Sequence, residues 1–290
     1  MSRNRLGVGL AFITPWMAGF LLLYLGPFVL SFIRSFTQWG MLSEPKFVGL
    51  RNYIRLFTAD PYYLPAFINT LFYVFVGTLL STTLGLVVAQ MLSYDVFGVR
   101  VFRTVFMLPV LMPVVAASLV FVLIYDYDIG ALNNFIRAIG GSPVGWLTSA
   151  RVVKTSIVLT TVWKQGRVIL IFVAAIKGIP AHLYESATID GANSVQKFFR
   201  ITVPQVSAVI VLNSIVSIIG YFQIFAEPYV MTNGGPGAAS QSYALYLYQT
   251  AFQSFRMGYA SAMSSILFVV IMVITILYLK LSHRFVYSEV

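Results

Sequence analysis

The stretch that decides the fold reads Glu185-Ser186-Ala187, then Gly191, then Ile201-Thr202-Val203-Pro204. It is a short polar segment between two hydrophobic runs. Pro180 suits the first turn of a helix, where its missing N–H costs nothing. Residues 181–189 favour a helix, and Gly191 can end that helix because glycine readily adopts a positive φ. We therefore expect an ordered helical turn here rather than a flexible loop.

A second short helix is expected directly after this turn. Asn193 or Ser194 can cap its N-terminus, and it should run to Phe199. Pro204 then lies where the next hydrophobic span begins. Two short helices joined by a glycine turn form a rigid knob, which can transmit the motion of a partner to the flanking helices. The alternative is an amphipathic hairpin lying on lipid headgroups, which the Lys197–Arg200 segment would suit.

The composition indicates an integral membrane protein. The chain is 59% hydrophobic and 10% charged, with a mean hydropathy of +0.85, more apolar surface than a soluble domain of this length can bury. The chain has no cysteine, which excludes disulfides and thiolate metal sites. The net charge of +10 could indicate nucleic acid. Lys and Arg are dispersed singly, however, so we expect no nucleic acid, and anionic lipid headgroups are the expected counterpart.

Six membrane spans are predicted, since a span needs about 20 predominantly apolar residues. They lie at about residues 8–32, 66–92, 104–126, 152–177, 203–229 and 257–281, in a single all-α domain covering 1–290. The first resembles a signal peptide, but its apolar run is too long, so we read it as a retained anchor. The fourth contains Lys164 and Arg167. It is needed if the polar loop 178–202 is to share a side with the C-terminus.

The orientation of the spans does not follow from charge. Basic residues are almost equally divided between the two sides, so the positive-inside rule decides nothing. The short loop 94–104 and the basic N-terminus mildly favour their own side as cytoplasmic.

The spacing of the polar stretch resembles a family signature. The membrane subunits of binding-protein-dependent ABC importers carry a signature loop. It reads Glu-Ala-Ala, then three residues, Gly, nine residues, Ile, one further residue and Leu-Pro. Here Ser186 replaces an alanine and Val203 replaces the leucine. The resemblance implies a type I ABC importer transmembrane domain and a cytoplasmic loop. It also implies that the loop couples to an ATPase through Glu185, Ser186, Ala187, Asp190, Gly191, Ile201 and Pro204.

Two further segments resemble the maltose-permease-like carbohydrate subfamily. Thr232-Asn233-Gly234-Gly235-Pro236 follows the fifth span, and Phe47-Val48-Gly49-Leu50-Arg51-Asn52-Tyr53 falls in the first outer loop. Gly-Gly-Pro alone could be an ordinary turn. Its position one loop beyond the signature favours the subfamily.

The resemblance implies several partners in a bacterial or archaeal cytoplasmic membrane. They are a second, homologous permease, an ATP-binding cassette ATPase dimer, an extracytoplasmic substrate-binding protein and a sugar. The chain has no Gly-Lys dipeptide and hence no phosphate-binding P-loop. ATP and Mg²⁺ are therefore expected on the separate ATPase, and this chain is expected to bind no cofactor or metal and to catalyse nothing.

The fourth span suggests where a substrate passes. Lys164 and Arg167 share one helix face, and a charge at the bilayer centre points to a functional or water-filled site. Trp163, Lys164 and Gln165 together offer an aromatic face, a cation and an amide, which suit the ring face and hydroxyls of a sugar. The two cations could instead snorkel to the interface, or be neutralised by Glu227 or by the loop residues Asp126 and Asp128.

The fifth and third spans add candidates. Ser217, Tyr221 and Ile224 recur at helical spacing, and the resemblance places their face toward the sugar, although ordinary helix packing is a serious alternative. Residues 108–113 should bend or break the third span at its prolines. The resemblance makes Val110 and Val114 candidate contacts beside this bend, which could equally be only a structural kink.

Three alternative functions compete with sugar import. A phosphorylated polyol such as glycerol phosphate is an alternative cargo, since Lys164 or Arg167 could hold a phosphate. An ion-coupled secondary transporter would typically need buried carboxylates at the midplane. Apart from Asp126 at the very end of the third predicted span, Glu227 is the only acidic residue within a predicted span. A membrane enzyme would need a convergent catalytic set, but both histidines fall outside the spans.

Overall fold

The computed structural model describes residues 2–94 and 97–282, and these form two compact units. The first unit combines the chain up to Asp60 with Leu247–Val269, and the second contains Pro61–Tyr246 and the chain from Val270. The predicted all-α class is confirmed: within the described residues the only sheet is one pair of two-residue strands.

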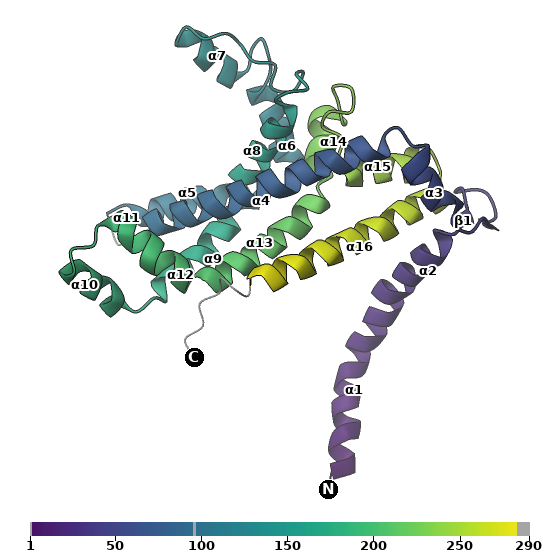
Figure 1. Ribbon diagram of the computed structural model, residues 1–290, viewed down its shortest axis with the longest axis horizontal. Helices are drawn as coiled ribbons and strands as arrows, with labels where there is room; N and C mark the ends of the chain where they lie inside the picture. Colours follow the sequence, from purple (N-terminus) through teal and green to yellow (C-terminus); the bar gives the residue numbers. More distant parts are fainter. Residues whose placement is uncertain (1, 95–96, 283–290) are drawn as a thin grey trace. The chain divides into compact units, whose positions relative to one another are not determined.

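The first unit begins with a long apolar helical segment. It consists of α1 (Ser2–Phe20), a π-helical turn (Leu21–Leu25) and α2 (Gly26–Arg34), which follow one another in Figure 1. Its stretch Phe12–Arg34 is long and apolar enough to cross a membrane.

A compact loop follows α2 in the same unit. Strands β1 (Thr37–Gln38) and β2 (Lys46–Phe47) pair antiparallel with Thr37 opposite Phe47, and α3 (Arg51–Thr58) follows. The Asn52 side-chain amide donates to the carbonyl oxygens of Ser35 (2.8 Å) and Thr37 (2.9 Å). The segment that resembles a subfamily marker therefore ties its own loop to the end of α2.

The second unit is organised around α4 (Tyr63–Ser93), which packs mainly against α9 (Gly166–Lys177) and α13 (Ser207–Phe222). Three small buried residues of α4 recur every four positions: Gly77, Ser81 and Gly85. Small residues let membrane helices approach closely. An apolar core lies near the C-terminal end of α4. Most of its residues belong to α4, α5 and α9, among them Leu86 and Phe172.

Three of the six predicted spans are bent. Helices α5 (Val99–Leu111) and α6 (Val114–Ile124) meet at 103°, and α8 (Val153–Trp163) meets α9 at 52°. Residues 194–205 meet α13 at 71°. Pro113 explains the first bend, because the residue before a proline is driven out of the helical conformation, and Met112 is extended with ψ 129°.

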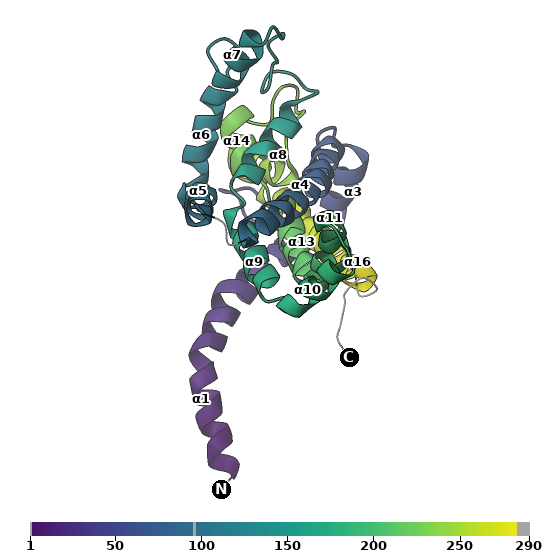
Figure 2. The same cartoon turned by 90° about the vertical axis from the view of Figure 1, so that its left-hand side faces the viewer.

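The predicted span 203–229 does not form one helix. Helix α13 stops at Phe222, and α14 (Ala226–Thr232) starts after a three-residue break. The Ser242 hydroxyl donates to the Ile224 carbonyl oxygen at 2.6 Å, which satisfies a backbone group that the break leaves unpaired. Figure 2 shows α14 beside α6, with which it packs.

Outside the polar loop, the remaining helices are α7 (Ala131–Ala138), α15 (Tyr243–Tyr248), a π-helical turn (Gln249–Gln253) and α16 (Met257–Ser282). In length and composition, α4, α16 and Phe12–Arg34 could each cross a membrane, and the three bent pairs raise the number of candidate spans in the described chain to six.

Candidate functional site

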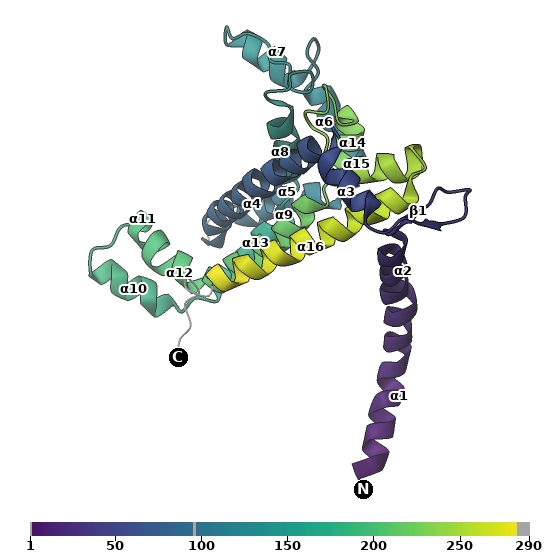
Figure 3. The same cartoon turned by 45° about the vertical axis from the view of Figure 1, so that its right-hand side comes forward.

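The polar stretch folds into a helical hairpin, visible in Figure 3 as α10 and α11. Helix α10 (Ala181–Ile189) follows Pro180 and has the predicted bounds, and Gly191 has the predicted positive φ of 77°. Asn193 and Gln196 form a reciprocal capping box at the start of α11 (Ser194–Lys197). Beyond Lys197 the chain continues as a π-helical turn to Thr202 instead of ending at Phe199.

Two side-chain hydrogen bonds hold the arms of this hairpin together. The Tyr184 hydroxyl pairs with the Thr202 hydroxyl at 2.9 Å, and Thr202 is fully buried. The Lys197 ammonium donates to the Thr188 hydroxyl at 2.7 Å. Because both bonds join α10 to the segment that leads into α12 (Val203–Gln205), movement of α10 must be passed to that segment.

One face of α10 is exposed. None of its nine residues is buried, and Ile189 is 87% exposed. Glu185 and Ser186 are exposed as well, and with His182 and Ile189 they recur at i, i+3, i+4 and i+7, which places them on one side of the helix. This face, defined by His182, Glu185, Ser186 and Ile189, is called the docking face below.

The other signature residues lie between the arms of the hairpin or at its end. Ala187, Asp190, Gly191 and Ile201 line a small cavity of about 340 Å³ between its arms, together with Lys197 and Arg200. Pro204 lies in α12, where the next helical segment starts. The signature therefore divides into residues that present a surface and residues that close the hairpin behind it.

A second candidate site is a cavity of about 490 Å³ in the second unit. Two helix breaks open onto it: Arg167 lies in the first turn of α9, just after the α8–α9 break, and Glu227 lies in the first turn of α14. The predicted pathway residues Ser217, Tyr221 and Ile224 all line it. Glu227 is only 7% exposed, and Lys164 attracts it electrostatically.

Tyr221 is fixed by α4. Its hydroxyl pairs with that of Ser81 at 2.9 Å, and its ring lies where a Cβ on Gly77 would have to be. The small residues of α4 therefore accept a large aromatic ring from α13, so Tyr221 both lines the cavity and packs two helices together.

The other predicted pathway residues do not line this cavity. The Trp163 ring packs edge-on against Phe121 with 5.2 Å between centroids, which joins α8 to α6. Val110 approaches Gly166 at the α8–α9 break, and Val114 begins α6. Lys164 and Gln165 form the α8–α9 break itself. Their contact with a substrate stays a prediction.

Comparison with protein families identifies the chain. Residues 81–287 match the model of the family described as "Binding-protein-dependent transport system inner membrane component". The chain belongs to this family. It is therefore an ABC transporter permease, a multi-pass membrane subunit, as the signature stretch predicted.

Relatives and a solved structure agree with the family. The permease is 35% identical to the probable ABC transporter permease protein YesP of Bacillus subtilis over 97% of this chain and 92% of that one. It is 34% identical to the arabinooligosaccharides transport system permease protein AraP of the same organism, over 94% and 88%. The crystal structure of a bacterial alginate ABC transporter, in complex with an alginate pentasaccharide-bound periplasmic protein, contains a chain with a TM-score of 0.86 and 23% identity. The match covers 99% of the permease and 98% of that chain.

Sequence reasoning did not single out Ile189 for the docking face, and it named Glu227 only as one possible partner of Lys164 and Arg167, not as a cavity residue. The periodicity from His182 to Ile189 could have indicated the first, since an apolar residue on a polar helix face suggests a contact. No local signal places Glu227 beside Arg167, because 60 residues separate them and the helix breaks bring them together.

The packing of Tyr221 on α4 gives a stability prediction. Gly77→Ala should destabilise the permease by about 1–3 kcal/mol, since its methyl group overlaps the Tyr221 ring. Thermal unfolding of the purified permease in detergent measures this. Gly220→Ala is the matched control: nothing lies within 4 Å of its added Cβ, so stability should be unchanged or slightly raised. Equal melting temperatures for both variants would contradict the packing argument.

Proposed function

We propose that the permease forms half of the translocation pathway of an ATP-driven sugar importer. It would pair with a second, homologous permease and with two ATPase subunits that bind ATP and Mg²⁺. An extracytoplasmic binding protein would deliver a mono- or oligosaccharide. The permease itself would catalyse no reaction and would lie in the cytoplasmic membrane with the hairpin on the cytoplasmic side.

The observation that carries this proposal is the hairpin. It presents an exposed helix face while two hydrogen bonds fix it to the segment that leads into α12. The chain has no P-loop, so energy from ATP must arrive through contact with another subunit. A surface that is exposed but firmly attached is what such a contact requires.

Alternating access follows from this arrangement. Closure of the ATPases would push the docking face, and the Tyr184–Thr202 bond would pass the movement to α12 and α13. Helix α13 ends at the cavity of about 490 Å³ in the second unit, which Ser217 and Tyr221 line. A shift of α13 would therefore change the shape of the cavity, opening it outward for delivery and inward after hydrolysis.

A sugar is the favoured cargo for two reasons. Relatives over most of the chain are named for oligosaccharides, as in AraP. The cavity also offers hydroxyl and amide groups from Thr161, Ser217 and Gln223 beside the Tyr221 ring, and sugar hydroxyls and ring faces suit such groups. Arg167 in the same cavity favours a phosphorylated polyol as the second candidate, since a guanidinium binds phosphate well.

Purification and reconstitution test the proposal. The tagged permease, isolated from its native membrane, should bring with it an ATPase and a second permease. In liposomes with the binding protein of the same system, ATP should drive uptake of labelled arabinotriose or maltose. Glycerol 3-phosphate is the matched anionic probe. Uptake of glycerol 3-phosphate alone would overturn the sugar assignment, and uptake by the permease alone without ATP would overturn the importer itself.

A further inference from the structure

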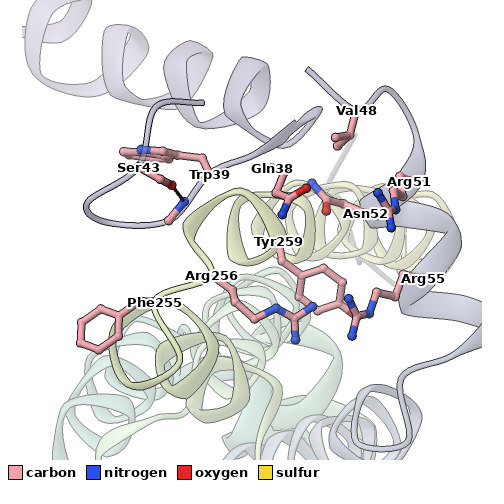
Figure 4. Close-up of a pocket in the computed structure, with 11 residues that line it drawn as sticks. Gln38, Trp39, Ser43, Val48, Arg51, Asn52, Arg55, Phe255, Arg256 and Tyr259 are labelled. Carbon is pink, nitrogen blue, oxygen red and sulfur yellow. Dashed lines mark hydrogen bonds between the residues drawn. The ribbon is translucent and has the colours of Figure 1, made fainter. Parts of the chain in front are cut away.

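A pocket in the first unit is unrelated to the hairpin and to the membrane cavity. Its volume is about 300 Å³, and it is lined by the loop after α2, by α3 and by the start of α16. Figure 4 shows Arg51, Arg55 and Arg256 around it, with Tyr259 between the last two. Eleven residues of the described chain line the pocket, and none of their side chains carries a carboxylate.

The arginines are arranged around one aromatic ring. The Arg256 guanidinium lies 4.1 Å from the centroid of the Tyr259 ring, and that of Arg55 lies 5.9 Å from it. The Tyr259 hydroxyl donates to the Asp60 carboxylate at 2.5 Å. That carboxylate thus engages the far end of the ring and is not among the pocket-lining groups. With Arg51, three arginines surround the pocket against this one neighbouring carboxylate, so the pocket keeps a net positive charge.

Backbone hydrogen bonds fix the frame of the pocket. The Gly258 N–H donates to the Trp39 carbonyl oxygen at 3.0 Å, and a Cβ on Gly258 would overlap the Thr37 carbonyl oxygen. Only glycine lets the start of α16 come this close to β1. With the Asn52 clamp on Ser35 and Thr37, the pocket is preformed.

The pocket lies where two spans end. The apolar segment Phe12–Arg34 stops just before the pocket's first lining residue, Gln38, and α16 begins at Met257, between the lining residues Arg256 and Tyr259. Helix α3 adds an apolar stripe, because Leu50 (60%), Ile54 (60%) and Phe57 (68%) are exposed at helical spacing. An amphipathic helix with such a stripe lies along the membrane interface. The arginines are therefore held at headgroup depth.

We propose that this pocket binds the phosphate of a membrane phospholipid, whose acyl chains extend into the bilayer beside α3. Guanidinium groups bind phosphate through paired hydrogen bonds. The buried Tyr259 ring holds the Arg55 and Arg256 guanidinium groups in place for that purpose. An anionic headgroup such as phosphatidylglycerol should be preferred over phosphatidylcholine, whose choline would bring a positive charge toward the arginines.

A lipid suits the pocket better than an acidic segment of a partner protein. Two of the three arginines belong to α3, and the exposed apolar stripe runs along the opposite side of the same helix. With the stripe sunk into the hydrocarbon, the pocket opens among the lipid headgroups. A phospholipid headgroup is then already beside the arginines, whereas an acidic protein segment would have to displace it.

Native mass spectrometry of the full-length permease with its co-purified partners tests this. The complex is titrated with dioleoyl phosphatidylglycerol and, separately, with dioleoyl phosphatidylcholine. The double variant Arg55→Gln/Arg256→Gln should lose roughly tenfold or more in retained phosphatidylglycerol, because each basic residue adds to the attraction for anionic lipid. The control Lys46→Gln/Arg151→Gln removes the same charge at exposed positions outside the pocket, and should retain lipid like the wild type.

Several outcomes would overturn the proposal. Equal retention by the wild type and the Arg55/Arg256 variant would remove the site, and equal loss in the control would reduce it to general surface charge. Displacement by millimolar inorganic phosphate with no lipid retained would identify a free-anion site. Loss of binding-protein association with lipid retained would identify an acidic protein partner instead.

The wild type alone provides a second test should the double variant fail to fold. Phosphatidylglycerol with a photoreactive headgroup should cross-link to peptides containing residues 38–55 and 255–259. Cross-links confined to other segments would refute the site.

Discussion

Ile189→Asp is expected to detach the ATPase from the permease and to reduce ATP-driven uptake to background. Ile189 is 87% exposed, so its replacement leaves the fold of the isolated chain intact. A partner that covers the docking face would bury this side chain, and full burial of an isoleucine contributes about 1.5–3 kcal/mol. Its loss alone weakens association roughly ten- to hundredfold, and burying a carboxylate without a partner adds to the effect.

Co-purification of the ATPase with the tagged permease, followed by uptake in liposomes, measures the result. Leu42→Asp is the matched control, since Leu42 is also fully exposed but lies in the β1–β2 loop of the first unit. It should change neither quantity. An Ile189→Asp complex that keeps its ATPase and transports normally would show that the docking face is not the site of coupling.

The hairpin was largely predictable because its signals are local. The Pro180 start, the positive φ of Gly191 and the Asn193 cap follow from residues a few positions apart. Its rigidity was not predictable in the same way. The Tyr184–Thr202 bond joins residues separated by a turn whose closing angle no local rule gives.

The bends in the spans were predictable only in part. Pro113 breaks the third span through a backbone effect of proline itself, so the sequence could locate it. The break at Lys164–Gln165 has no such marker. It places Gly166 against the Phe106 carbonyl oxygen, where a Cβ would not fit, so the reason for the glycine lies in a neighbouring helix.

The membrane cavity shows the same limit. Helical spacing placed Ser217 and Tyr221 on one face, and both line the cavity. Glu227 joins them only because α13 ends at Phe222 and the chain restarts at Ala226. The hydrogen bond from Ser242 that stabilises this break comes from a residue that follows α14, and periodicity within one span cannot show it.

The position of Glu227 gives the second prediction with a large expected effect. Glu227→Leu should reduce the amount of folded permease in the membrane roughly tenfold or more. The carboxylate is almost fully buried, faces the cavity shared with Arg167 and attracts Lys164. Removing it leaves two cations within the membrane without their nearby negative charge. An uncompensated charge at the centre of a membrane helix costs about 2.5–3.5 kcal/mol on insertion scales.

A second substitution separates charge balance from a specific role of the carboxylate. Lys164→Met added to Glu227→Leu removes one of the two cations and should restore most of the lost protein, as detected by quantitative blotting of membranes and by size-exclusion profiles. Glu44→Leu makes the same chemical change at an exposed position in the first unit and should have no effect. If the double variant recovers no protein, Lys164 is not the cation that Glu227 balances, and Arg167→Met in its place becomes the deciding variant. Wild-type abundance of Glu227→Leu alone would mean that the cavity is hydrated enough to solvate both cations, which would favour an open aqueous pathway at this depth.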